Sequence, residues 1–129
     1  MRRILLDTHV YLWWLDDSPK LSHKARKMIE NAEIVYVSSA SIWEAVIKIR
    51  TGKLELEVTP DELIEGIERS GFVELPILAE HALAVYGLAN HHKDPFDRML
   101  VAQAISEPLL LLTVDPEVQK YSPDLVFMI

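Results

Sequence analysis

Residues 3–15 read RILLDTHVYLWWL and place two structural signals next to each other. Residues 3–6 are a short apolar run that ends at Asp7, which is typical of a buried strand. Residues 10–15 continue with helical character and stop at a polar segment that contains a proline. The stretch therefore predicts a strand followed directly by a helix, with a carboxylate at their junction.

The same alternation of strand and helix continues to the end of the sequence. Further strands are expected at residues 34–37, 72–75 and 109–113, with a fifth candidate at 126–129. Helices are expected at residues 22–32, 41–50, 59–70, 79–90 and 96–106. Continuous apolar strands that alternate with helices indicate a parallel sheet covered by helices on both faces.

Composition narrows the class of protein. The chain has 129 residues, the size of one domain, and half of them are hydrophobic. It contains no cysteine, which excludes disulfides and thiolate metal sites and fits the reducing cytoplasm. No apolar run reaches the length of a membrane span. We therefore expect a single cytoplasmic domain, residues 1–129, without a membrane partner.

The net charge is −7, from 13 basic and 20 acidic residues. Proteins that simply coat nucleic acid are basic, so this chain is not expected to act in that way. The acidic residues are either scattered over the surface for solubility or gathered where cations neutralise them. Their positions in the sequence decide between these alternatives.

Four acids fall where a parallel sheet would bring them together, because such sheets carry their sites beyond the carboxyl ends of the strands. Asp7 follows the first strand and Asp115 follows the strand at 109–113. Glu44 lies in the helix after the second strand, and Asp97 opens the helix at 96–106. Ligands that offer only oxygen suit Mg²⁺ or Mn²⁺.

Each acid also has a structural interpretation when it is taken alone. Asp7, Asp94 and Asp115 are placed to cap helices, the last two with a proline next in sequence. Glu44 and Lys48 are four residues apart, the spacing of a helical ion pair. Clustered carboxylates would raise one another's pKa, and a bound cation would remove that repulsion. We therefore expect a site that is flexible without a metal ion and rigid when the ion is bound.

Four segments in order resemble the PIN-domain family, and within it the toxin ribonucleases of VapBC toxin–antitoxin pairs. They cover almost the whole chain, and the third is the most specific. The segments are LLDTH at 5–9, SSASIWE at 38–44 followed by Lys48 and GKL at 52–54, HKDPFDRMLVAQA at 92–104, and LTVD at 112–115.

The resemblance implies a three-layer α/β/α PIN-like fold with a short, mainly parallel central sheet of four to five strands. It implies an endoribonuclease that depends on Mg²⁺ or Mn²⁺, with Asp7, Glu44, Asp97 and Asp115 as catalytic and metal-binding residues. We expect Asp7 and Asp97 to bind the ion directly and the other two to orient its waters. It also implies a homodimer and a cognate antitoxin.

The residues beside this quartet are assigned supporting roles. Thr8, Ser41 and Thr113 match polar positions next to the acids, and Asp94 either assists them or only caps its helix. The candidate contacts for RNA phosphates follow the Glu44 helix or adjoin Asp97, and they are Lys48, Arg50, Lys53 and Arg98. An ordinary role as solvated surface residues explains each of them equally well.

The tryptophans have two interpretations. Trp13, Trp14 and Trp43 can belong to a hydrophobic surface that binds a partner, since aromatic side chains are enriched at interfaces. Trp43 lies midway along an apolar helix, and this position favours packing in the core.

Three rival functions have weaker support. His91, His92 and Asp94 invite a zinc site, but their spacing does not match a helical histidine pair, so a solvated loop is favoured. An aspartyl-phosphate phosphotransferase needs an acid where His9 stands and a lysine after the late strand. A PIN-like module that binds RNA or protein without cutting has no need of four acids, and metal-dependent turnover distinguishes it from a nuclease.

Overall fold

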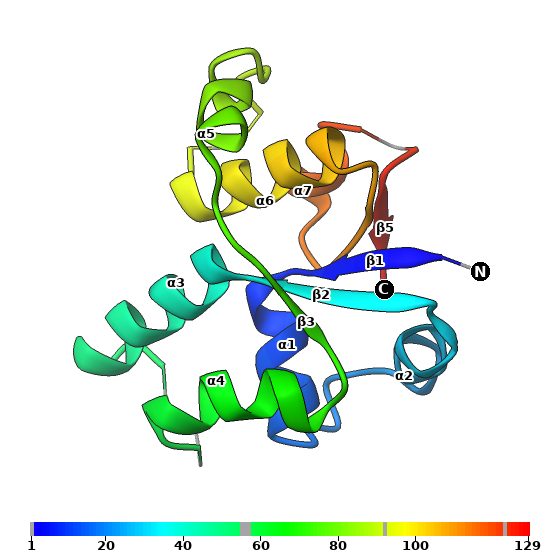
Figure 1. Ribbon diagram of the computed structural model, residues 1–129, viewed down its shortest axis with the longest axis vertical. Helices are drawn as coiled ribbons and strands as arrows, with labels where there is room; N and C mark the ends of the chain where they lie inside the picture. Colours follow the sequence, from blue (N-terminus) through cyan, green and yellow to red (C-terminus); the bar gives the residue numbers. More distant parts are fainter. Residues whose placement is uncertain (1, 55–57, 92, 123) are drawn as a thin grey trace.

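The computed structural model describes residues 2–54, 58–91, 93–122 and 124–129 (Figure 1). Its strands are β1 Arg3–Leu6, β2 Ile34–Ser38, β3 Val73–Leu75, β4 Leu110–Thr113 and β5 Val126–Met128. Its helices are α1 Thr8–Leu15, α2 His23–Asn31, α3 Ser39–Arg50, α4 Pro60–Arg69, α5 Ala79–Tyr86, α6 Pro95–Ser106 and α7 Pro116–Gln119. These elements follow the order that the sequence predicts.

The strands form one sheet in the order β3-β2-β1-β4-β5, and every neighbouring pair is parallel. β1 lies in the middle, where Leu5 pairs with Tyr36 on one side and Leu111 on the other. Parallel strands need crossover connections, and helices supply them here. The predicted parallel sheet is confirmed, with five strands.

Helices cover both faces of this sheet (Figure 1). Side chains alternate along each strand, so Ile4 and Leu6 join the core that includes residues of α1 and α2. Leu5 points the other way, into a second core with Leu111 and residues of α6. Figure 1 shows α1, α2 and α4 on one side and α5, α6 and α7 on the other, which confirms the three-layer prediction.

A glycine allows α4 to approach α1 closely. A Cβ added at Gly66 would collide with Cδ2 of Leu15 and would lie 3.0 Å from the hydroxyl of Tyr11. That hydroxyl donates to the carbonyl of Leu63 at 2.6 Å, so the buried polar atom is satisfied. The contact fixes α1, whose first residue follows Asp7 directly.

The helix predicted at 79–90 is shorter in the structure. It ends at Tyr86, and the N–H of Gly87 bonds the carbonyls of Ala84 and Val85. The predicted end at residue 90 was wrong, because the helix ends before Gly87, a residue with low helix propensity. His92, part of the most specific segment and of the rival zinc site, lies outside the described residues.

The preference for packing Trp43 in the core was also wrong, because its side chain is 60% exposed. Its ring meets that of Phe96 edge-on, with centroids 5.2 Å apart. Trp14 does pack against the core, and its indole N–H donates to Ser70. No helix in the described part of the chain is long and apolar enough to span a membrane.

Candidate active site

Asp7 stands at the carboxyl end of the central strand β1 and caps α1. Its Oδ1 accepts from the backbone N–H of Val10 at 2.9 Å, and its Oδ2 accepts from the hydroxyl of Thr113 at 2.6 Å. The residue is 5% exposed. The capping interpretation is therefore confirmed, and two neutral donors hold the carboxylate in place.

Burial raises the pKa of Asp7 above its ordinary value, although the bonds from Thr113 and Val10 act in the opposite direction. The sequence predicted a raised pKa from repulsion between carboxylates, but the largest cause is loss of hydration. A cation beside this buried carboxylate would stabilise its charged form.

Thr113 connects Asp7 to Asp115. Its hydroxyl donates to Asp7 and accepts from the backbone N–H of Asp115 at 3.1 Å. Asp115 in turn caps α7 by accepting from Glu117 N–H at 2.9 Å. Because β1 and β4 are neighbours in the sheet, their carboxyl ends bring these two acids to one edge.

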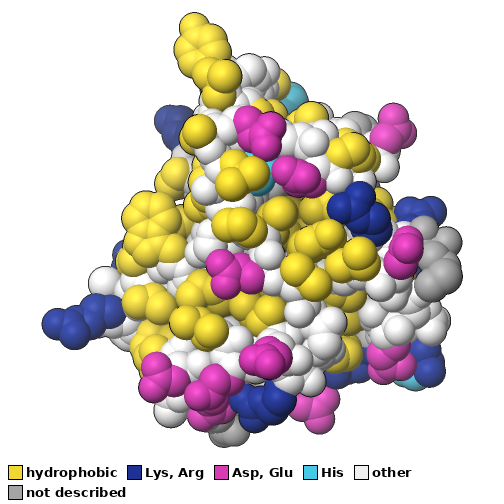
Figure 2. Space-filling view, in the orientation of Figure 1, with side chains coloured by type: hydrophobic (Ala, Val, Ile, Leu, Met, Phe, Trp, Pro, Cys, Tyr) yellow, Lys and Arg dark blue, Asp and Glu magenta, His cyan; other side chains and the backbone are white. Residues whose placement is uncertain are grey.

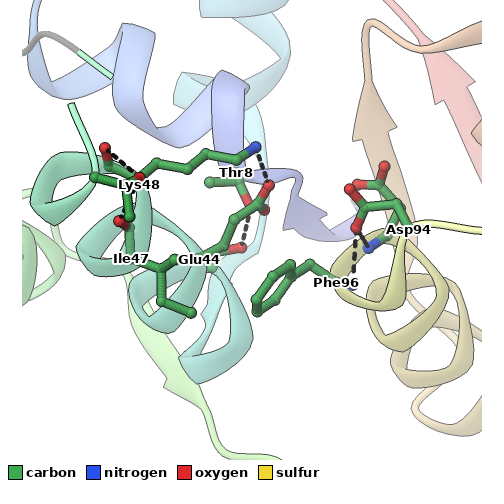
Figure 3. A network of polar contacts seen from close by, with 9 residues as sticks. Thr8, Glu44, Ile47, Lys48, Asp94 and Phe96 are labelled. Carbon is green, nitrogen blue, oxygen red and sulfur yellow. Dashed lines mark hydrogen bonds and ion pairs between the residues drawn. The ribbon is translucent and has the colours of Figure 1, made fainter. Parts of the chain in front are cut away.

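Glu44 lies on α3 and is 3% exposed. Its Oε1 accepts from the hydroxyl of Thr8 at 2.6 Å, and its Oε2 accepts from the ammonium of Lys48 at 2.6 Å. The hydroxyl of Ser41 lies 3.0 Å from that of Thr8. Both Glu44 oxygens are therefore engaged, as Figure 3 shows, and the predicted ion pair with Lys48 is confirmed.

Asp94 and Asp97 occupy the start of α6. Oδ1 of Asp94 accepts from the N–H groups of Phe96 and Asp97 at 2.8 and 3.0 Å, which confirms Asp94 as a helix cap. Both acids contribute to the electrostatic environment of Lys48. Partial burial works against the charge of that lysine, but its bond and attraction to Glu44, with help from both aspartates, leave its pKa raised.

The predicted residues thus lie in two groups, one around Lys48 and one at the ends of β1 and β4. Figure 3 shows Glu44, Lys48 and Thr8 on one side, and Asp94 with Phe96 on the other. The contact between Trp43 and Phe96 joins α3 to α6 next to these acids. Asp7, Thr113 and Asp115 form the second group at the ends of β1 and β4.

The side chains suit a divalent metal ion of the magnesium type. The candidate ligands are carboxylates, and each oxygen has two lone pairs, so an oxygen that accepts one hydrogen bond can still bind a cation. Asp7 is buried, and Val10 and Thr113, which donate to its oxygens, are neutral donors. The Lys48 ammonium supplies at Glu44 the positive charge that a metal ion would bring.

The other predicted phosphate contacts differ in their environment. Arg50 and Lys53 are exposed at the end of α3 and beyond it. Arg98 instead donates to the carbonyls of Ala89 and Val85, at 3.0 and 3.3 Å, and to the hydroxyl of Tyr121 at 3.1 Å. Its contact with RNA stays a prediction, and in the structure it connects α6 to the end of α5 and to the segment after α5.

Arg98→Met is expected to lower the free energy of unfolding by about 1–2 kcal/mol, because two carbonyls and the Tyr121 hydroxyl lose a charged donor. Thermal melting measures the effect. Arg50→Met, which changes an exposed arginine, serves as the control and should shift the melting temperature by less than about 2 °C. Equal melting of the two variants would show that the Arg98 contacts add nothing to stability.

Sequence reasoning missed a buried histidine outside this edge of the sheet. Among the described residues, Glu80, His81 and Glu107 place three ligand atoms within 4.8 Å of one another. Nδ1 of His81 accepts from Leu78 N–H at 3.0 Å, so its proton lies on Nε2, 2.7 Å from Glu107. Because Nδ1 already accepts a hydrogen bond, a metal ion on Nε2 would have to replace the ring's proton. The histidine instead connects α5 to the end of α6 through Glu107.

Comparison with known proteins identifies relatives along nearly the whole chain. The profile of the PIN domain matches residues 4–122. Ribonuclease VapC22 of Mycobacterium tuberculosis (strain ATCC 25618 / H37Rv) is 28% identical over 125 residues, which are 94% of this chain and 93% of that protein.

Solved structures share the fold at lower identity. VapBC from Salmonella typhimurium bound to DNA aligns with a TM-score of 0.71 and 17% identity, over 99% of this chain and 98% of that one. VapBC2 from Rickettsia felis, bound to a promoter DNA fragment, gives 0.69 and 14%, over 98% of both chains. These matches establish the architecture independently of the local sequence motifs.

Proposed function

The chain belongs to the PIN domain family, and from this membership we propose that it is a metal-dependent endoribonuclease that acts as the toxin of a toxin–antitoxin pair. The similarity to a ribonuclease along 94% of the chain supports this activity. We further propose that residues 1–129 act as one catalytic domain.

The observation that carries the proposal is the pair of buried carboxylates at the carboxyl edge of the sheet. Asp7 and Glu44 are each 5% exposed or less. A protein that needed them only as a cap or as an ion pair could keep them in solvent, where charges are far less costly. Their burial beside Thr8 and Thr113 therefore favours a site built to receive a cation.

We assign Asp7 and Asp97 as direct ligands of Mg²⁺ or Mn²⁺, with Glu44 and Asp115 orienting water around the ion. With an ion bound there, these residues would hold the charge that lowers the pKa of a water molecule and offsets negative charge on the phosphate. Thr113 and Val10 hold the Asp7 carboxylate, and Thr8 holds that of Glu44. These bonds fix the carboxylates before substrate arrives, which limits reorganisation during the reaction.

RNA must approach against a net charge of −7. Lys48, Arg50 and Lys53 lie on or just after α3, so they are placed to contact phosphates next to Glu44. Binding through such cations weakens as salt rises. This substrate role for the three residues rests on their placement and on the family resemblance.

The antitoxin and homodimer are proposed on the family resemblance and on the solved VapBC complexes. Exposed apolar side chains support the proposal that a partner covers this surface, because isolated domains rarely expose large apolar patches. Figure 2 shows such side chains over α3 and α5. Trp43 and Phe96 also help to line a hollow of about 390 Å³ with Ile77 and Val85.

The test compares cleavage of an unstructured RNA in Mg²⁺, in Mn²⁺ and in EDTA, for the wild type and for Asp97→Asn. We expect cleavage only with metal, and a loss of about a thousandfold in the variant, since the site then lacks one charged ligand. Asp61→Asn is the matched control. Asp61 also lies in the first turn of a helix after a proline, but it is exposed on α4.

Equal cleavage by the wild type and by Asp97→Asn would assign the activity to a contaminant. If the wild type binds metal and RNA but leaves every RNA intact, the alternative of a non-catalytic PIN-like module is favoured. An aspartyl-phosphate enzyme would instead acquire a covalent phosphate on Asp7, which mass spectrometry detects.

A further inference from the structure

Lys48 lies in an unusual position for a helical ion pair. Its Nζ is 2.6 Å from Oε2 of Glu44, whose side chain is 4% exposed, while the lysine side chain is 32% exposed. The chain offers a direct comparison in Lys27 and Glu30 on α2. That pair is 3.8 Å apart, and its side chains are 57% and 52% exposed.

The difference matters because a buried carboxylate cannot rely on water to stabilise its charge. Thr8 provides one neutral hydrogen bond to Glu44, and the Lys48 ammonium provides the formal positive charge next to it. The same ammonium is attracted by Asp94 and Asp97 across the site. Lys48 thus stands where acids from α3 and α6 approach one another (Figure 3).

We propose that Lys48 is an internal counter-cation that occupies the acidic site in the metal-free protein and gives way when a divalent ion binds. The inference rests on the proposed function, since it takes the acids as a metal site. Lys48 acts through Glu44 and its neighbours, so it is a positioning residue.

Two features of the lysine fit this exchange. Its long side chain is partly exposed, so the ammonium can leave Glu44 for solvent without unfolding α3. Two cations at one group of carboxylates also repel each other, so binding of a metal weakens the hold on the ammonium. Lys48 therefore keeps Glu44 in place in the empty site and lowers the apparent affinity for metal.

The experiment compares wild type, Lys48→Met and Lys27→Met. Calorimetric titration with Mn²⁺ measures metal affinity, and thermal melting with and without Mn²⁺ measures stability. Methionine keeps the length and apolar part of the side chain but removes the charge. Lys27→Met removes an exposed paired lysine and changes the net charge by the same amount as Lys48→Met, so it controls for long-range electrostatics.

For Lys48→Met we expect Mn²⁺ to bind at least about fivefold more tightly than to wild type, because no ammonium competes for the carboxylates. We expect the metal-free variant to melt about 3–8 °C lower, since Glu44 keeps a buried charge without its partner. Saturating Mn²⁺ should restore most of this loss. Lys27→Met should resemble the wild type in both measurements.

Equal or weaker Mn²⁺ binding by Lys48→Met would overturn the inference and leave the proposed function intact. Absence of Mn²⁺ binding in both the wild type and the variant would overturn the proposed function and the inference with it. The two failures are therefore distinguished by the wild-type titration.

Discussion

Asp7→Asn is expected to abolish RNA cleavage and at the same time to stabilise the metal-free protein. The activity falls because a neutral amide is a poor ligand for Mg²⁺ or Mn²⁺ where a charged carboxylate is needed. We expect a loss of about a thousandfold or more. The fold survives because Asn caps helices about as well as Asp, and its oxygen can still accept from Val10 N–H.

The stability gain follows from the burial of Asp7. Burial raises the pKa of this carboxyl in the folded state, so the folded protein favours the protonated form more than the unfolded chain does. The cost of the charge is therefore absent below the ordinary value of 3.8 and is present in full above the raised pKa. Asparagine removes this cost, so the variant is expected to be more stable than the wild type above the raised pKa.

Thermal melting in EDTA from pH 3 to pH 8 measures the effect. The gap between Asp7→Asn and wild type should open as the pH rises through the titration of Asp7, to roughly 3–10 °C. Asp16→Asn, an exposed residue just after α1, is the control for net charge and should show no such gap. A variant that melts lower than wild type at pH 7 would show that the carboxylate is stabilising without metal.

Leu111→Ala is expected to cost about 3–5 kcal/mol of folding free energy. Leu111 is fully buried in β4, where it pairs with Leu5 of β1 and Val126 of β5. Truncation at the centre of the sheet leaves a cavity that neighbouring strands cannot fill without breaking their register. The melting temperature should fall by about 10–20 °C.

Leu83→Ala provides the matched control, because Leu83 is 75% exposed on α5. It should change the melting temperature by less than about 2 °C. Well below its melting temperature, Leu111→Ala should retain most of any RNA cleavage, since Leu111 packs in the hydrophobic core with Leu5, Val101 and Val126. A small stability change in Leu111→Ala would show that the β1–β4 core repacks easily.

The sheet could be predicted from the sequence because its signals are local. Apolar runs such as residues 3–6 end at polar residues, and each end lies at the same edge of a parallel sheet. The acids after those runs follow from the same rule. Their hydrogen bonds do not, because Thr113 reaches Asp7 across 106 positions. Family resemblance marked Thr113 as a polar position but gave no partner for it.

Trp43 shows where periodicity fails. An apolar helix is normally taken to be buried, but α3 begins at the edge of the sheet and extends away from it (Figure 1). Trp43, Val46 and Ile47 are therefore exposed. A sequence pattern describes the faces of a helix but not how much of its length lies over a core. His81 was missed for a related reason, since Glu107, its partner, is 26 positions away.

The bond between Thr113 and Asp7 also bears on how the chain is made. β1 is translated first and can pair with β2 early, but its pairing with β4 must wait until β4 has left the ribosome. Until then Asp7 lacks its hydroxyl donor, and Asp115 is absent from the edge. A nascent chain therefore cannot assemble the proposed active site before its fourth strand emerges.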